Sequence, residues 1–138
     1  MAAPIKDTDT ASDRISKLLP ADITAAFLSA RAGLNGFFQD AATSAGFVFW
    51  TFVIILVLCP LYFWFASDVR KIYHVAFLAL SFAVFSISIA ASDFSVFLSQ
   101  NHVPDANTYT NAVAIVLPAV WAFIVTPIVA RNINVPKP

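Results

Sequence analysis

Three long apolar runs dominate the pattern of hydrophobic and polar positions, at residues 46–65, 73–91 and 112–130. No Asp, Glu, Lys or Arg interrupts any of them. A helix rises about 1.5 Å per residue, so each run is long enough to cross a hydrocarbon layer roughly 30 Å thick. A membrane-spanning β-strand would alternate polar and apolar residues, and the run GFVFWTFVIILVLCPLYFWF does not. The pattern predicts an all-α integral membrane protein with three transmembrane helices.

The segment ahead of these runs shows helical periodicity instead of continuous hydrophobicity. Apolar and small residues recur every three or four positions, which places them on one helical face: Ile15, Leu19, Ile23, Ala26, Ala30, Gly33 and Phe37. Pro20 followed by Asp22 predicts a helix start, and the segment Gly33–Gly36 predicts its end. Because Asp22 and Arg31 are unfavourable in hydrocarbon, we expect an amphipathic helix at the membrane interface or against another subunit. The chain then divides into three parts: a disordered polar tail (1–11), an amphipathic helical segment (12–40) and a three-helix transmembrane domain (41–138).

Composition agrees with the membrane class. Hydrophobic residues make up 59% of the chain and charged residues 12%, an imbalance that a soluble domain of 138 residues could not cover with polar surface. The net charge of zero gives no electrostatic basis for binding nucleic acid. The polar start of the chain has no signal-peptide core, so insertion is expected to rely on the spans. The segment LLPADITAAFLSA ahead of a membrane hairpin favours a bacterial inner (plasma) membrane.

Positive charges beside the spans predict an orientation. Arg70 and Lys71 lie between the first two spans and Arg131 follows the third, whereas the loop between the second and third spans has no Lys or Arg. The positive-inside rule therefore places the hairpin turn and the C-terminus in the cytoplasm and the N-terminus outside. The basic residues of the N-terminal segment oppose this orientation: Lys6, Arg14, Lys17 and Arg31.

The second span carries a stripe of serines. With about 100° of rotation per residue, most of its serines fall within about 60° of one another, in a sector that also holds His74. The stripe consists of His74, Ser81, Ser88, Ser92, Ser95 and Ser99, and only Ser86 points elsewhere. Three apolar residues share the sector towards the cytoplasmic half: Phe77, Leu78 and Phe85. A hydroxyl row on a membrane helix is expected to face protein or water, because an unpaired polar group in hydrocarbon is costly.

This stripe supports two hypotheses about function. If copies of the second span ringed an axis, the serines would form a wettable vestibule and the Phe77, Leu78 and Phe85 side chains a hydrophobic constriction, as in a gated pore. Alternatively, the serines are small residues of a dry helix-packing seam, each hydrogen bond contributing about 0.6 kcal/mol. The sequence therefore predicts a small membrane protein that self-assembles as an oligomeric pore or channel lined by the second span. The alternative is a non-catalytic accessory or scaffold subunit of a larger membrane complex. The lipid bilayer, further copies of the chain and other membrane subunits are the expected partners.

The sequence contains little that would support catalysis or metal binding. On a continuous helix His74 and His102 would lie about 40 Å apart, so they could not share a metal ion. None of the HExxH, CxxC and GxSxG motifs occurs, and the chain has no Glu. Asp93, near the outer end of the second span, is expected to be a solvated boundary residue, and Cys59 an apolar filler. We expect no enzyme activity, no catalytic residues, no metal site and no cofactor.

Overall fold

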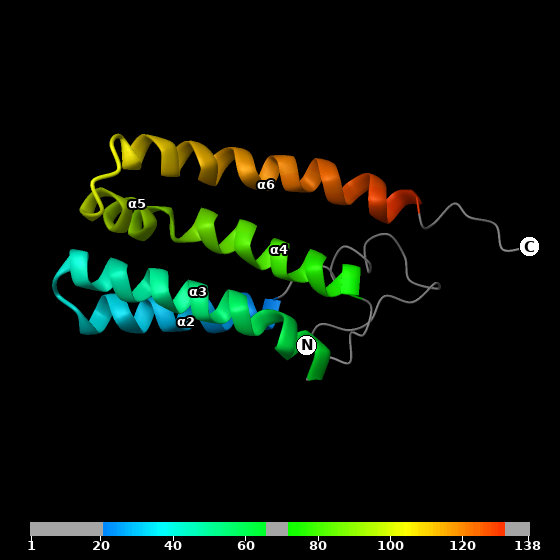
Figure 1. Ribbon diagram of the computed structural model, residues 1–138, viewed down its shortest axis with the longest axis horizontal. Coiled ribbons are helices and arrows are strands. Elements are labelled where there is room, and N and C mark those ends of the chain that lie inside the picture. Colours follow the sequence, from blue (N-terminus) through cyan, green and yellow to red (C-terminus); the bar gives the residue numbers. More distant parts are fainter. Residues whose placement is uncertain (1–20, 66–71, 132–138) are drawn as a thin grey trace, which may run out of the picture.

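The computed structural model describes residues 21–65 and 72–131, and within these ranges every element is a helix (Figure 1). The tail expected at residues 1–11 and the turn expected at Ser67–Lys71 lie outside the described residues. The helices, in chain order, are α2 (Ala21–Phe37), α3 (Ala41–Phe65), α4 (Ile72–Ile89), α5 (Ala91–Gln100) and α6 (Ala106–Arg131).

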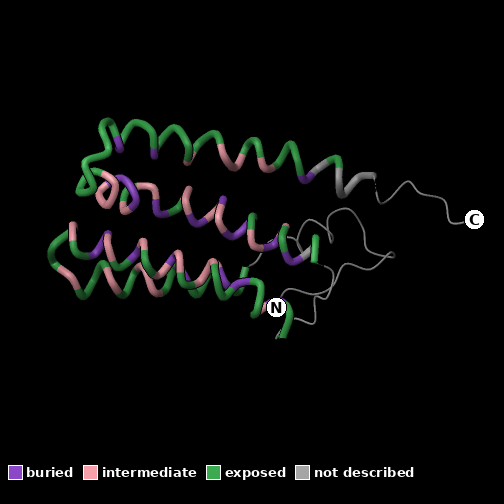
Figure 2. The backbone as a smooth tube through the Cα atoms, viewed as in Figure 1, coloured by how far each residue is buried: buried purple, intermediate pink, exposed green. Residues whose placement is uncertain are grey.

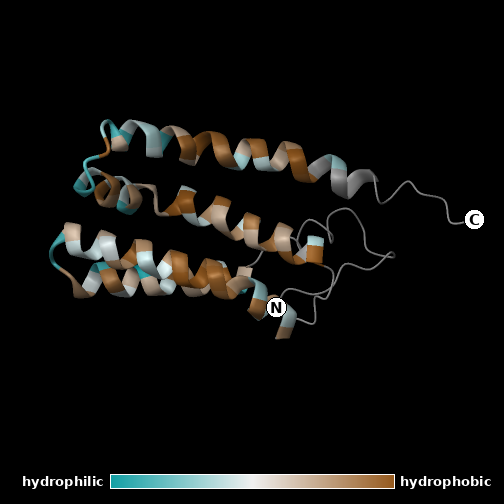
Figure 3. Cartoon of the chain, in the orientation of Figure 1, coloured by the Kyte–Doolittle hydropathy of each residue, from teal (hydrophilic) through white to brown (hydrophobic). Residues whose placement is uncertain are grey.

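Two of these helices are long and apolar enough to cross a membrane: α3 and the Ala106–Val125 part of α6. The pair α4 and α5 provides a third crossing if the two helices are taken as one broken span. The prediction of an all-helical protein with membrane-spanning segments is therefore confirmed at this level. Figure 3 shows the hydrophobic colours along the middle of α3, α4 and α6, with hydrophilic colours at the end that holds α5 and its loop.

The second span is not the continuous helix on which the serine stripe and the distance from His74 to His102 were predicted. The chain breaks at Ala90, and α5 turns by 79° from the direction of α4. Ala90 has φ −101° and ψ 22°, outside the helical region. Two residues earlier, the Ser88 hydroxyl donates to the Val84 carbonyl (2.9 Å), a contact of the kind that often bends helices. No Pro or Gly lies near this break, so the usual residues that kink a helix do not predict it.

An aromatic core joins α2, α3, α4 and α5. Phe27 of α2 is fully buried, with ring centroids 6.1 Å from Phe52 of α3 and 6.0 Å from Phe82 of α4. Phe52 also lies 5.8 Å from Phe82 and 5.2 Å from Phe94 of α5. These edge-to-face and stacked pairs each add about 0.5–1.5 kcal/mol beyond the apolar area that they bury. The centre of the protein therefore lies between α2, α3 and α4.

α2 packs lengthwise and antiparallel to α3 of its own chain and also contacts α4 (Figure 1). The sequence did not predict this contact, and a location of the helix at the membrane interface or against another subunit stays a prediction. The described part of this helix starts at Ala21 and continues past Gly33 and Gly36, beyond the predicted end, to Phe37. The physical reason for the contact is that the apolar face of α2, with Ile23 and Phe27, completes the aromatic core.

On the other side of α4, α6 has a smaller buried share in its most apolar stretch than α3 has. Among the described residues it contacts α4 and α5. Trp121 packs on Phe77 of α4, with ring centroids 5.7 Å apart, and beside Val125. Figure 2 shows exposed backbone along much of α6, whereas buried positions recur along α4. The bundle therefore places α4 between the α2–α3 pair and α6.

Candidate functional site

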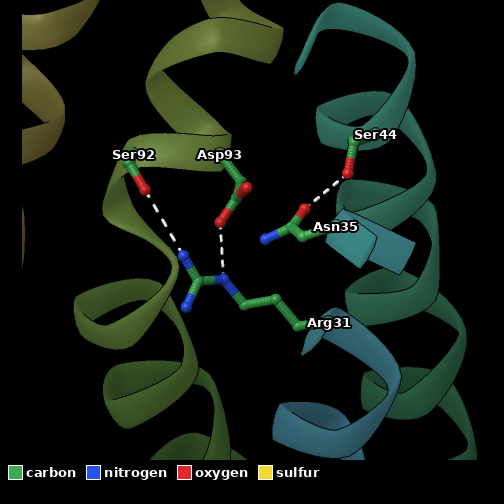
Figure 4. Close-up of polar contacts among 5 residues, drawn as sticks. All are labelled: Arg31, Asn35, Ser44, Ser92 and Asp93. Atoms are coloured by element: carbon green, nitrogen blue, oxygen red, sulfur yellow. Dashed lines mark hydrogen bonds and ion pairs between the residues drawn. The ribbon is translucent and has the colours of Figure 1, made fainter. Parts of the chain in front are cut away.

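A polar cluster lies at the end of the bundle where α5 crosses (Figure 4). Arg31 of α2 reaches Asp93 in the first turn of α5, with its Nε donating to Asp93 Oδ2 at 2.6 Å. The side chain of Arg31 is 24% exposed and that of Asp93 is 12% exposed. A carboxylate in the first turn of a helix also interacts favourably with the helix dipole. The pair therefore fastens the start of α5, just beyond the bend, to α2.

Two further contacts complete this cluster. A terminal guanidinium nitrogen of Arg31 lies 3.4 Å from the Ser92 hydroxyl, which accepts the hydrogen bond. On the α3 side, the Ser44 hydroxyl donates to the amide oxygen of Asn35 (Figure 4). Ser44 is buried, whereas Asn35 is exposed, so this bond stabilises the α2–α3 pair close to its turn.

The start of α3 is capped by Asp40. Its Oδ2 accepts hydrogen bonds from the Thr43 hydroxyl (2.6 Å) and the Thr43 backbone amide (2.8 Å), the arrangement of a helix N-cap. These hydrogen bonds, the hydroxyl bond first, lower the pKa of the Asp40 carboxyl below its usual range. The hydrogen bonds of Asp40 thus define the start of α3, and the turn before this helix carries a negative charge.

The serines of the predicted stripe lie on two helices, α4 and α5, and they contact different partners. Ser81 is buried and accepts a hydrogen bond from the indole nitrogen of Trp121 in α6, at 2.9 Å. Ser95 is also buried, and its hydroxyl lies 3.3 Å from Asn107 Oδ1 of α6. Ser92 instead accepts from Arg31 of α2. Because the helix bends at Ala90, the serines before and after the break do not form one straight row along a single helix.

Other members of the stripe bond to their own helix. The Ser88 hydroxyl donates to the Val84 carbonyl at 2.9 Å, and the Ser99 hydroxyl donates to the Ser95 carbonyl at 2.8 Å. Ser86, which the pattern placed off the stripe, is fully buried, and its hydroxyl has no hydrogen-bond partner in the part of the chain that the structure describes. His74 lies in α4, and its side chain is outside the described part.

The residues of the predicted constriction do not share a surface of the single chain. Phe77 is half-buried against Trp121 of α6. Leu78 is fully buried in the aromatic core on the opposite side of α4. Phe85 is half-buried. An axis lined by all three would therefore require Leu78 to leave the core of its own chain.

Sequence reasoning placed Asp93 at a solvated boundary and missed its partner. Arg31 and Asp93 are 62 positions apart, and the ion pair forms because α2 lies along α3 and α5 bends back across the end of the bundle. The available signal was one basic residue in the N-terminal helix and one acidic residue at the end of the second span. Among residues 21–65 and 72–131, no group of three or more His, Cys, Asp or Glu side chains could hold a metal ion.

Comparisons of the chain with protein-family models, with curated proteins and with solved structures found no match. Function must therefore be inferred from the contacts of this chain itself.

Proposed function

We propose that the protein is a non-catalytic accessory or scaffold subunit of a membrane complex, crossing the bilayer with α3, α4 and α6. In this arrangement α4 crosses as a helix of about 27 Å and α5 turns aside at the membrane surface. The observation that carries the proposal is that the serine hydroxyls of the stripe, unlike that of Ser86, have hydrogen-bond partners inside the chain. Ser81 and Ser95 contact α6, and Ser88 bonds to its own backbone. This favours a packing seam over a water-filled path.

The surfaces left for partners are apolar. In α6 the exposed side chains include Val113, Ile115, Val116, Val120, Phe123 and Ile124. In α3 they include Trp50, Ile54, Val57, Leu58, Leu61 and Trp64. Helices associate in membranes mainly through close van der Waals packing, and these two faces lie on different sides of the bundle. They fit contact with lipid and with other membrane-embedded chains.

A homo-oligomeric pore is the second candidate. Ser92 and Ser99 of α5 are exposed, and Phe85 of α4 is only half-buried, so these residues are available to line a shared path between copies. In such an assembly α5 would contribute hydroxyls at one membrane surface, and Phe85 would contribute to an apolar barrier deeper in the bilayer.

Vesicle leakage separates the two proposals. The purified chain, reconstituted alone, is expected to leave vesicles of neutral lipid tight to small ions, and Phe85→Ser is expected to leave them equally tight. Phe123→Ser, at a position of α6 that is 81% exposed, is the matched control for a polar change in a span. Leakage that appears with Phe85→Ser and not with Phe123→Ser, together with a ring of identical chains by native mass spectrometry, would favour the pore and contradict the accessory subunit.

A further inference from the structure

We propose that α2 is itself embedded in the bilayer, with lipid acyl chains covering its outward face and with the N-terminal tail on the same side as the C-terminus. The inference rests on the membrane crossing proposed for α3, because α2 packs lengthwise against that helix. A helix that lies along a membrane span shares its depth. With 17 residues, α2 is about 25 Å long, close to the 27 Å or so of α4.

The outward face of α2 suits an apolar surrounding. Its exposed residues between the first turn and Arg31 are uncharged, and they continue as small residues beyond it: Ala25, Ala26, Leu28, Ser29, Ala32 and Gly33. The charged residues of α2 are Asp22, in the first turn, and Arg31. Asp22 lies at the end of α2 where the ends of α3 and α6 also lie, at the expected membrane surface (Figure 1).

The charge of Arg31 was one reason to expect this helix outside the hydrocarbon. In the structure, the carboxylate of Asp93 neutralises this charge. An unpaired guanidinium in hydrocarbon is costly, but ionisable residues within membrane segments that face the bundle and pair with one another are tolerated. Arg31 turns towards α5, where Asp93 lies 2.6 Å away and the Ser92 hydroxyl 3.4 Å away. The pair contributes no net charge, so α2 presents no unpaired cation to lipid.

The distribution of basic residues supports the same placement. The start of α2, the end of α3, the start of α4 and the end of α6 lie at one end of the bundle (Figure 1). Except for Arg31, every Lys and Arg lies in the sequence segments that precede α2, connect α3 with α4, or end or follow α6: Lys6, Arg14, Lys17, Arg70, Lys71, Arg131 and Lys137. The loops at the opposite end, residues 38–40 and 101–105, have none. With α2 embedded, the positive-inside rule applies to the whole chain, and the N-terminal charges no longer oppose it.

Sidedness of single cysteines tests the topology. In a Cys59→Ser background, Ser12→Cys, Asn101→Cys and Lys137→Cys are labelled with a membrane-impermeant maleimide in sealed inside-out and right-side-out vesicles. We expect Ser12→Cys and Lys137→Cys to react in the same vesicles and Asn101→Cys only in the opposite ones. If Ser12→Cys reacts together with Asn101→Cys while Lys137→Cys does not, α2 does not cross and this inference is wrong. If Asn101→Cys and Lys137→Cys react from one side, the proposed crossing of α6 fails instead.

The occupant of the outward face is tested by a spin label at Ser29→Cys in the same background. We expect collisions with oxygen, which concentrates in lipid, to exceed those with a water-soluble nickel chelate. Collisions dominated by the chelate would place α2 in water or at the interface. A label shielded from both, with high-yield crosslinking of Ser29→Cys to another chain, would identify a protein on this face. Either result would overturn the assignment to lipid.

The ion pair gives a third measurement. Asp93→Leu leaves Arg31 unpaired, so we expect a fraction of Ser12→Cys to change sides or the yield of inserted chain to fall several-fold. Adding Arg31→Met to Asp93→Leu removes the lone charge and is expected to restore uniform sidedness. A single Asp93→Leu variant with unchanged insertion and sidedness would contradict the role of the pair in embedding α2.

Discussion

The two long apolar helices, α3 and α6, are bound to the rest of the chain in different ways. In their most apolar stretches 22% of α3 is buried inside the chain, against 11% of α6. α3 contacts α2, α4 and α5 and supplies Phe49 and Phe52 to the aromatic core, whereas α6 contacts α4 and α5. The contacts within the chain are thus concentrated on the α3 side, and most of the described surface of α6 is exposed.

The largest effect is expected from Phe27→Ala. Phe27 is fully buried against Phe52 and Phe82, so its removal loses aromatic contacts and leaves a cavity. We expect a loss of about 3–5 kcal/mol in the free energy of unfolding, measured with a denaturing detergent in mixed micelles. Leu28→Ala, at a position 37% exposed on the same helix, is the control and should cost far less. Equal losses of unfolding free energy for the two variants would contradict the conclusion that the aromatic core lies between α2, α3 and α4.

A smaller loss is expected when the ion pair between α2 and α5 is broken. Arg31→Met removes a charge-assisted hydrogen bond, and such bonds contribute about 1.5–3 kcal/mol. The double variant with Asp93→Asn should be less destabilised than the sum of the single variants, because the two side chains interact directly. Ser92→Ala is the control, since its contact with Arg31 is long at 3.4 Å. Strictly additive losses would show that Arg31 and Asp93 do not stabilise each other.

The α6 side is expected to respond more weakly to a single change. Trp121→Phe keeps the ring on Phe77 but removes the hydrogen bond to Ser81, which in membrane proteins averages about 0.6 kcal/mol. Ser81→Ala should cost a similar amount, and the two changes together little more than either one. If Trp121→Phe destabilised the chain as much as Phe27→Ala does, the contrast between α3 and α6 would be lost.

The smallest effect is expected at the start of α3 and depends on pH. Because hydrogen bonds from Thr43 lower the pKa of Asp40 in the folded chain, the ionised cap stabilises the helix start above the unfolded pKa. This contribution is lost as the pH falls through the lowered pKa. We measure hydrogen exchange of the first amides of α3 at pH about 3 and at pH about 6 and correct both rates for the intrinsic effect of pH on exchange. We expect the corrected rate to be higher at the lower pH. Asp40→Asn, which caps without titrating, should remove that difference, and its persistence would argue against the cap.

The sequence predicted the helices of this fold better than their packing. Uninterrupted apolar runs predicted α3, α4 and α6, and helical periodicity predicted α2, because these features depend on neighbouring residues alone. The break at Ala90 could not be predicted, since no Pro or Gly marks it. With the break unseen, the serines were placed on one continuous face. Packing against three different surroundings divides them instead: Ser81 and Ser95 on α6, Ser92 on α2, and Ser88 on its own backbone.

The pairing of Arg31 with Asp93 could not be predicted when each residue was considered singly. Arg31 alone argues against a membrane location, and Asp93 alone indicates a helix end in water. Their pairing depends on the antiparallel contact of α2 with α3 and on the 79° turn into α5, which are tertiary features. The contact of α2 with α3 also explains why Phe27 is fully buried. Periodicity over residues 12–40 did not distinguish Phe27 from its neighbours.

Water access along α4 tests most directly whether the second span is held by packing inside the chain. Single cysteines at Ser81, Ser88 and Ser99 in a Cys59→Ser background are treated with an impermeant thiol reagent, because thiolates form only where water reaches. Leu80→Cys, at a position 52% exposed on the apolar surface, is the lipid-facing control. We expect Ser99→Cys to react, and Ser81→Cys and Ser88→Cys to be as inert as Leu80→Cys. Reaction of Ser81→Cys and Ser88→Cys at the rate of Ser99→Cys would contradict the dry seam and show a water-filled path along α4.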